Sequence, residues 1–204
     1  RLGLEPDVPV LLVFGGSQAV RRLDEAVDEA LGDIVERCTV VHITGRDQGA
    51  EAVALARRDA LDEGVQDRYR PFAFLDEDMD AALTAADLLV GRAGSSTLAE
   101  AAAAGLPMIV VPYPHAAAHQ RANAAEMVEA AAALLDDDED LDGNTLREAC
   151  ARVGAERLRE MSAAAERVAR PGAAAATVTL LERLAGGEAL PTQGELDELS
   201  GAAA

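Results

Sequence analysis

The chain has 204 residues, enough for one α/β domain with a sizeable core. Its formal net charge is −19 and every basic residue is arginine, and so acidic a surface argues against general binding of nucleic acid or anionic lipid. No apolar run approaches the roughly 18 residues of a membrane span, and the N-terminus lacks a signal-peptide layout, so we expect a cytoplasmic chain.

The cysteines and the first residues each support one further expectation. Cys38 and Cys150 lack metal-ligand spacing, so we expect buried free thiols rather than a disulfide. Residues 1–7 begin without Met and have the composition of a linker that leads into a strand. This pattern indicates a chain that starts at a domain boundary.

Apolar runs alternate with amphipathic helical patterns through most of the chain, and no hairpin signal separates the runs. The sequence therefore predicts an α/β fold with a single Rossmann-like, doubly wound parallel sheet. We predict strands at 8–14, 39–45, 69–75, 87–90 and 108–112, a short sixth strand at 133–136, and helices at about 20–31, 49–63, 76–85, 122–132, 141–153, 155–170 and 173–185.

Two segments in the second half of the chain have no predicted place in the sheet. The acidic turn 137–142 is expected to be a solvated loop and helix cap. Residues 1–185 would then form one domain, followed by a flexible tail of small and polar residues at 186–204.

A glycine-containing turn and a helix start follow the fourth predicted strand. Ser95, Ser96 and Thr97 can all serve as caps there. A helix start with free N–H groups and small hydroxyl side chains suits an anion, above all a phosphate. Glu100 lies one turn further on, where its carboxylate can reach a sugar hydroxyl. The segment 91–100 therefore predicts a site for a nucleotide-sugar diphosphate.

A second glycine turn, Gly15-Gly16-Ser17-Gln18, follows the first predicted strand. It lacks the third glycine of a dinucleotide fingerprint, so it gives little support to an NAD site. The two glycines alone fit a plain strand-to-helix turn equally well. Ser17 at the expected N-cap, beside Gln18, favours a phosphate or substrate contact.

Two further loops are expected at the same sheet edge, where ligands bind in open α/β sheets. Phe74 and Leu75 end the third strand and could enclose a nucleobase. The loop after the fifth strand holds two of the three histidines, His115 and His119, with Gln120 nearby. No Cys or Glu accompanies them at metal spacing, so we expect no metal site. The third histidine, His42, lies within a strand and is expected to be structural.

These four segments, in this order and at these separations, resemble the C-terminal domain of the MurG family of peptidoglycan N-acetylglucosaminyltransferases. The resemblance covers residues 9–185 and is most specific at 92–100 and 112–123. It implies the C-terminal half of a GT-B enzyme of glycosyltransferase family 28, which holds UDP-N-acetylglucosamine. The whole enzyme would make lipid II at the cytoplasmic face of the membrane, with inversion and without a metal ion or cofactor.

The resemblance also implies roles for individual residues. Gly16, Ser17, Ser95, Ser96 and Thr97 would bind the diphosphate. Leu75 would offer its backbone to the uracil, with Phe74 beside it. Glu100 would bind the ribose, and His119 and Gln120 the sugar. Either Arg92 or Arg121 could stabilise the departing UDP.

The sequence also departs from the family pattern. Ala19 and Val20 replace smaller residues, and the segment 74–79 is one residue longer than usual, which leaves the residue that meets the uracil open by one position. The N-terminal acceptor domain, which carries the expected base and the surface for membrane-embedded lipid I, is absent, so no catalytic residue is assigned and we expect the chain alone to be inactive.

Two alternative functions remain open. One is another family-28-type transferase for a glycolipid or natural product, including a domain that works with a separate acceptor chain. The other is a non-catalytic nucleotide-sugar-binding module or an epimerase-like relative.

Overall fold

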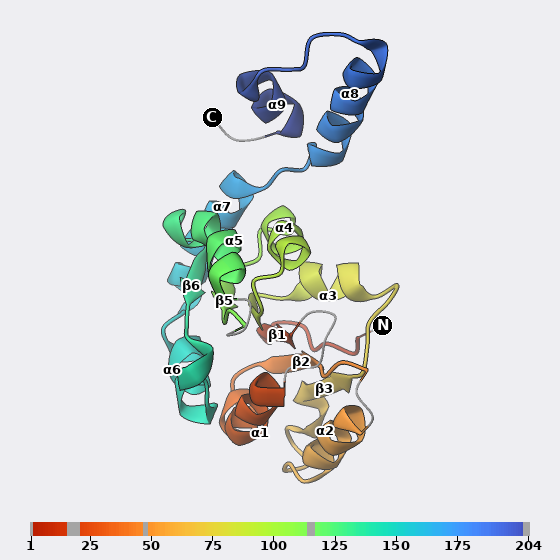
Figure 1. The fold of residues 1–204 in the computed structure, drawn as a ribbon. Helices are drawn as coiled ribbons and strands as arrows, with labels where there is room; N and C mark the ends of the chain where they lie inside the picture. The colour runs from red at the N-terminus through yellow and green to blue at the C-terminus, as the bar shows by residue number, and fades with distance from the viewer. Residues whose placement is uncertain (1, 16–20, 47–48, 114–116, 202–204) are drawn as a thin grey trace.

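The computed structural model describes residues 2–15, 21–46, 49–113 and 117–201 (Figure 1). Within them, one parallel sheet of six strands has the order β3-β2-β1-β4-β5-β6. The strands are β1 Val10–Phe14, β2 Thr39–Ile43, β3 Tyr69–Phe72, β4 Leu88–Gly91, β5 Met108–Val110 and β6 Ala133–Leu135.

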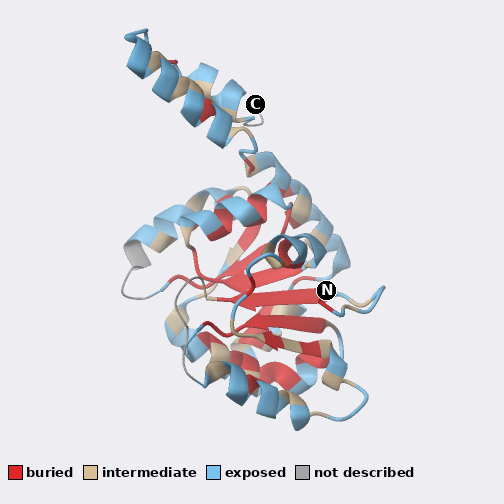
Figure 2. Ribbon diagram, turned by 90° about the vertical axis from the view of Figure 1, so that its right-hand side faces the viewer, coloured by how far each residue is buried: buried red, intermediate tan, exposed pale blue. Residues whose placement is uncertain are grey.

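Helices cover both faces of this sheet, which confirms the predicted doubly wound α/β fold. One buried cluster joins the sheet to α1, α2 and α6, and the other joins it to α3, α4 and α5, while α7 contributes to both. Figure 2 shows the buried strands between helices whose outer surfaces are exposed. The helices are α1 Arg21–Val35, α2 Ala50–Asp59, α3 Met79–Ala85, α4 Ser95–Ala103, α5 Ala117–Glu129, α6 Gly143–Ala151, α7 Ala155–Val168, α8 Ala173–Gly186 and α9 Gln193–Ser200.

The strands are shorter than the apolar runs that predict them. β3 ends at Phe72 rather than at residue 75, because the next N–H, that of Ala73, donates to the carboxylate of Glu51 at 3.0 Å instead of to a strand. Conversely, α5 begins at Ala117, five residues before its predicted start. The short sixth strand is confirmed, since β6 pairs with β5 over three residues.

The order of the strands reverses at β1, which lies between β2 and β4. The helices that follow β1 and β4 lie on opposite faces of the sheet, and in open α/β sheets this divergence marks the ligand-binding crevice at the carboxyl edge. Gly15 directly follows β1 and Arg92 directly follows β4. Gly15 and the turn that begins at Arg92 therefore flank the switch point.

Close contact between β1 and β4 requires a glycine at the end of β4. A Cβ atom added to Gly91 would lie 2.6 Å from the backbone oxygen of Phe14, closer than real Cβ contacts come. Phe14 and Gly91 are register partners in the parallel pairing. A side chain here would push the two strands apart at the mouth of the crevice.

We predict that Gly91→Ala lowers the free energy of unfolding by about 1–3 kcal/mol through overpacking. Gly64→Ala is the matched control, since its new Cβ would meet no atom within 4 Å, and a change within about 0.5 kcal/mol is expected. Chemical denaturation of the three proteins measures both values. Equal stability of Gly91→Ala and wild type would contradict the steric argument.

The C-terminal residues differ from the predicted tail. They contain α9, whose start is closed by a capping box in which Thr192 accepts from the Glu195 N–H and Glu195 accepts from Thr192. This helix packs against α8, away from the sheet (Figure 1). The sequence contains the Thr-x-x-Glu signature of a helix start at Thr192 and Glu195, but the small and polar residues around it led us to predict a flexible tail.

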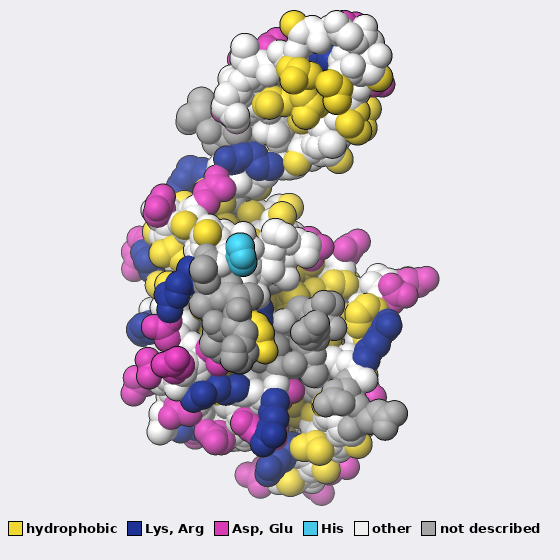
Figure 3. All heavy atoms as spheres, in the orientation of Figure 1, with side chains coloured by type: hydrophobic (Ala, Val, Ile, Leu, Met, Phe, Trp, Pro, Cys, Tyr) yellow, Lys and Arg dark blue, Asp and Glu magenta, His cyan; other side chains and the backbone are white. Residues whose placement is uncertain are grey.

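The α8–α9 hairpin leaves several large apolar side chains exposed. Figure 3 shows hydrophobic atoms gathered at this end of the molecule, whereas acidic and basic side chains are interspersed over the rest of the drawn face. The exposed residues on and just after α8 are Val178, Leu181, Leu184 and Leu190. Among the described residues, no helix is long and apolar enough to span a bilayer.

A second capping box starts α6. The Asp142 carboxylate accepts from the Thr145 N–H at 2.8 Å, and the Thr145 hydroxyl accepts from the Asp142 N–H at 2.7 Å. The backbone hydrogen bond from Thr145 is the main reason why the pKa of Asp142 lies below its ordinary value. The helix cap expected in the acidic turn is therefore present at its last residue.

We predict that Asp142→Ala lowers the melting temperature at neutral pH and that the difference from wild type narrows below about pH 4. A carboxylate with a lowered pKa stabilises the fold above its unfolded-state pKa, and that contribution is lost as the pH falls through the folded-state pKa. Thermal unfolding of both proteins over this pH range provides the measurement. Glu139→Ala, a nearby carboxylate outside the capping box, is the control and should show no such convergence.

Candidate functional site at the carboxyl edge of the sheet

The N-terminus of α4 lies at the switch point, and its first backbone donors have no hydrogen-bond acceptor among the described residues. Gly94 is the N-cap residue, so no side chain caps the helix, and the first helical hydrogen bond runs from Leu98 N to Gly94 O at 3.0 Å. The N–H groups of Ser95, Ser96 and Thr97 consequently have no acceptor inside the helix. The prediction that these three side chains act as caps is wrong: they occupy the first turn itself.

The side chains of this turn differ in exposure. Ser95 and Ser96 are exposed, whereas Thr97 is buried at 6% exposure and can offer an external ligand only its backbone. Glu100 is exposed and lies one turn further along α4. An anion at this helix start would meet the first backbone N–H groups of α4 and the hydroxyls of Ser95 and Ser96. The Glu100 carboxylate would lie about one helical turn away from it.

The first turns of α5 tie the loop after β4 to the loop after β5. The Gln120 carbonyl Oε1 accepts from the Ala93 N–H at 3.3 Å and from the Tyr113 N–H at 2.9 Å. Asn123 donates from Nδ2 to the Ala93 oxygen at 3.1 Å. Gln120 therefore lies beside the start of α4, and its neighbour His119 is exposed.

Two arginines that the sequence offered as stabilisers of a departing diphosphate already have carboxylate partners. Arg92 is buried, and its Nη2 lies 2.5 Å from Asp138 Oδ1. Arg121 forms an ion pair with Asp137. The segment 137–142 is thus not simply a solvated loop, because part of it pairs with arginines at the edge of the site.

The predicted uracil residues lie at the end of β3. Leu75 is buried and belongs to the same cluster as Phe14, Ala93 and Leu98, which border the crevice. Phe74 is 48% exposed, and the Arg46 guanidinium carbon lies 3.8 Å from the centroid of its ring. Because Arg46 covers one face of the ring, a base stacked on Phe74 would occupy the other face or displace the arginine.

The remaining predicted residues on this edge cannot be placed. Gly16 and Ser17, and also His115, lie outside the described residues. The structure brings Ser95, Ser96 and Gln120 close together through Ala93, but no described contact joins them to Phe74. The residues predicted to bind the diphosphate and the sugar are therefore connected, whereas those predicted to bind the base stand apart from them.

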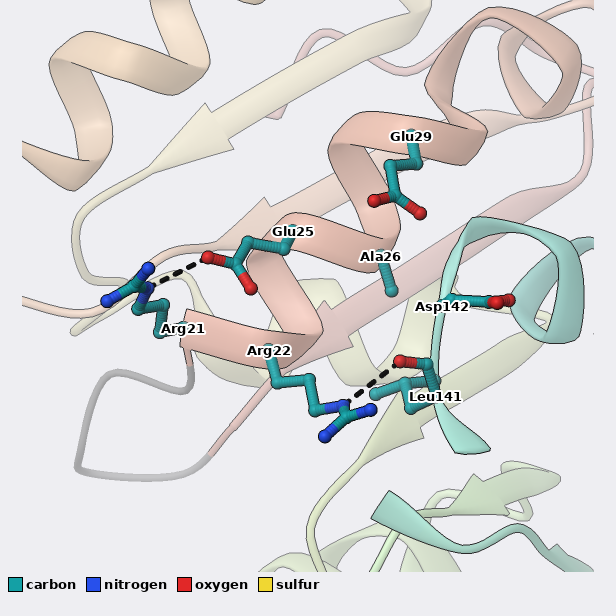
Figure 4. Close-up of a pocket in the computed structure, with 7 residues that line it drawn as sticks. All are labelled: Arg21, Arg22, Glu25, Ala26, Glu29, Leu141 and Asp142. Carbon is teal, nitrogen blue, oxygen red and sulfur yellow. Dashed lines mark hydrogen bonds and ion pairs between the residues drawn. The ribbon is translucent and has the colours of Figure 1, made fainter. Parts of the chain in front are cut away.

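A hollow of about 360 Å³ lies between α1 and the segment before α6 (Figure 4). Its cations are already engaged, since Arg21 pairs with Glu25 at 2.8 Å and Arg22 donates to the Leu141 oxygen at 3.1 Å. Its lining residues are Arg21, Arg22, Glu25, Ala26, Glu29, Leu141 and Asp142. With three carboxylates and only two paired arginines, this hollow is not suited to a diphosphate.

His42 has the structural role that the sequence predicted. It is 1% exposed, its Nδ1 lies 2.8 Å from the Tyr69 hydroxyl, and its Nε2 lies 3.0 Å from Asp24. Burial raises the pKa of Tyr69 above its ordinary value, so the phenol stays protonated. Among the described residues, no group of three or more His, Cys, Asp or Glu side chains could hold a metal ion.

Both cysteines are free, as predicted, but they are half-buried rather than buried. Burial is the main cause that raises the pKa of Cys38 to about 12 and that of Cys150 to about 11. Both thiols therefore stay protonated and unreactive at neutral pH.

The fold is an open, doubly wound α/β domain, and comparison with known proteins gives its family. Residues 10–178 match the glycosyltransferase family 28 C-terminal domain, so the chain belongs to that family. This confirms the resemblance noted from the sequence.

Two sequence relatives share the name UDP-N-acetylglucosamine--N-acetylmuramyl-(pentapeptide) pyrophosphoryl-undecaprenol N-acetylglucosamine transferase. The protein of that name from Frankia casuarinae is 41% identical over 89% of this chain and 47% of its own length. The one from Nocardioides sp. is 39% identical over 86% of this chain and 44% of its own. The chain thus spans about half the length of these relatives.

Solved structures agree with the sequence relatives. MurG of Acinetobacter baumannii is 30% identical, with a TM-score of 0.73 over 88% of this chain and 53% of that protein. A protein described as a putative UDP-N-acetylglucosamine 2-epimerase from Listeria monocytogenes has a TM-score of 0.63 at 18% identity, which shows a shared fold alone. The GT-B half-molecule predicted from the sequence is therefore the observed architecture.

We predict that Gln120→Leu lowers the free energy of unfolding by about 1 kcal/mol, because the N–H groups of Ala93 and Tyr113 lose their shared acceptor. The site is partly open, so water can replace some of the loss. Gln120→Glu retains an acceptor oxygen and should lose less stability than Gln120→Leu. His119→Ala, an exposed neighbour, should change stability by no more than about 0.5 kcal/mol in the same denaturation experiment.

Proposed function

We propose that this chain is the donor-binding half of a GlcNAc transferase and that it binds UDP-N-acetylglucosamine at the carboxyl edge of its sheet. The observation that carries the proposal is the free N-terminal turn of α4 at the switch point, which offers three backbone donors and two exposed hydroxyls. A diphosphate suits these groups and the positive end of the helix dipole.

The proposed subsites follow the segments of the chain. Ser95, Ser96 and the Thr97 N–H bind the diphosphate, together with Gly16 and Ser17. Glu100 accepts hydrogen bonds from the ribose diol. Leu75 and Phe74 border the uracil. His119 and Gln120 contact the sugar, and the Gln120 amide nitrogen is its natural donor because its oxygen is already bound to backbone.

The reaction that we propose is transfer of GlcNAc to an undecaprenyl-diphosphate-linked muramyl pentapeptide, with inversion and without a metal ion. Support comes from the name shared by relatives at 41% and 39% identity and from the 30%-identical MurG structure. Leaving UDP gains negative charge, which the α4 N-terminus can stabilise. We assign three further roles to a part of the relatives that this chain does not cover, which is about half their length. These roles are binding of the acceptor, supply of the catalytic base and attachment at the cytoplasmic face of the membrane.

Calorimetric titration of the chain with UDP-N-acetylglucosamine, UDP-glucose and UDP-galactose tests the donor site. We expect binding with preference for the GlcNAc donor and a loss of affinity of about tenfold or more in Glu100→Ala, since a hydrogen bond to a charged group contributes about 1.5–3 kcal/mol. With a 2′-deoxyribose analogue of UDP, the effect of Glu100→Ala should shrink, because that ligand lacks one hydroxyl of the diol.

Glu182→Ala is the control for loss of one surface charge, since Glu182 is exposed on α8, away from the sheet. It should bind like wild type. Absence of uridine-nucleotide binding by wild type would refute the donor site. Preference for UDP-galactose or UDP-glucose would instead favour a glycolipid or natural-product transferase.

A further inference from the structure

The acidic segment between β6 and α6 is held by arginines from four different parts of the chain. Arg22 of α1 donates to the backbone oxygens of Glu139 and Leu141, while the other three arginines pair with consecutive carboxylates. Those pairs are Arg152 with Asp136, Arg121 with Asp137 and Arg92 with Asp138. The segment, η3 Asp138–Asp140 included, therefore lies against the loop that follows β4 and the start of α1.

Only one of the three ion pairs is buried on both sides. The side chains of Arg92 and Asp138 are 6% and 10% exposed, whereas those of Arg121 and Asp137 are 45% and 52% exposed. A surface pair contributes little, but a buried arginine without its carboxylate would be an uncompensated charge. Asp138 is thus the partner on which the orientation of Arg92 depends.

Arg92 uses the other arm of its guanidinium to hold backbone at the start of the next loop. Its Nη1 donates to the Val111 oxygen at 2.9 Å and lies 3.3 Å from the Pro112 oxygen. The guanidinium is planar, so an anchor on Nη2 fixes the direction of Nη1 as well. Through Arg92, Asp138 therefore sets where the loop after β5 leaves the sheet.

The same two loops are joined a second time by Gln120, which bridges Ala93 and Tyr113. Ala93 follows Arg92, and Tyr113 follows Pro112, so the two connections form a closed network. The free turn of α4 starts two residues after Ala93, at Ser95. The network thus fixes the α4 N-terminus relative to the first turns of α5.

We propose that Asp138 is a positioning residue for the donor site, which acts through Arg92 to hold the diphosphate and sugar subsites at the spacing that a nucleoside diphosphate sugar requires. This inference rests on the proposed function. It assigns Asp138 no contact with the ligand. It also limits the effect to one side of the site, since Phe74 and Leu75 stand on the loop after β3, outside the network.

Because the network holds only one part of the site, its loss should affect some ligands more than others, which distinguishes a positioning role from a general structural role. Loss of the network should weaken the binding of UDP-N-acetylglucosamine, which uses every subsite, more than the binding of uridine, whose only proposed contact on α4 is that of Glu100 with the ribose. General destabilisation of the fold would weaken both ligands together.

Calorimetry with both ligands tests the proposal on wild type, Asp138→Asn and the matched control Asp137→Asn, at a temperature where thermal scans show all three folded. For Asp138→Asn we expect affinity for UDP-N-acetylglucosamine to fall by about tenfold or more, and affinity for uridine to fall by a clearly smaller factor. Asp137→Asn, whose arginine partner is largely exposed, should match wild type for both ligands.

The double variant Arg92→Gln/Asp138→Asn removes both buried charges and carries the test if Asp138→Asn does not fold. If Asp138 acts through Arg92, the double variant should lose no more affinity than Arg92→Gln alone. Additive losses, equal weakening of uridine, or wild-type affinity in Asp138→Asn would overturn the positioning role while leaving the donor site intact. Failure of wild type to bind UDP-N-acetylglucosamine would refute the proposed function and this inference with it.

Discussion

The backbone contact between Gly91 and Phe14 holds β1 and β4 together at the point where the strand order reverses. Every feature of the candidate site depends on this pairing. The two strands are neighbours in space, although 77 residues separate Val10 from Asp87, whose carboxylate accepts from the Val10 N–H at 2.8 Å. Since the elements that follow β1 and β4 lie on opposite faces, the start of α4 stands at the position where open α/β sheets bind their ligands.

Electrostatics then decides which groups in that crevice remain available to an anion. The chain carries a formal charge of −19, so a diphosphate cannot be held by the general field of the protein. Arg92 and Arg121 are paired with carboxylates, so among the described residues near the site the backbone N–H groups at the start of α4 are the source of positive potential. A fixed dipole of this kind needs no counter-charge and tolerates an acidic surface around it.

The acidic segment after β6 has a different role from the one that its composition suggests. A run of carboxylates ordinarily forms a solvated surface. Here it lies next to arginines that come from α1, α5, the end of α6 and the loop after β4, and the side chain of one of its members, Asp138, is only 10% exposed. Opposite charges distant in sequence thus neutralise each other and connect the two layers of the fold beside the site.

The sequence by itself determined the elements and their type. Continuous apolar runs such as Val10–Phe14 can only be strands buried on both faces, and turns without hairpin signals require parallel connections. The helix start at Ser95 was readable because small hydroxyl residues follow a glycine and precede an alanine-rich helix. The sequence also contains the capping-box residues Thr192 and Glu195 that start α9, although the small and polar residues around them are typical of a flexible tail.

Only the tertiary structure decided which side chains are free and which are engaged. Nothing local to Arg92 indicates that Asp138, 46 positions later, neutralises it, or that the Gln120 oxygen is committed to two backbone N–H groups. The burial of Thr97 and the stacking of Arg46 on Phe74 likewise depend on how separate elements pack. Periodicity reports the environment of an element, whereas the partners of a polar side chain are set by segments that meet only when the chain folds.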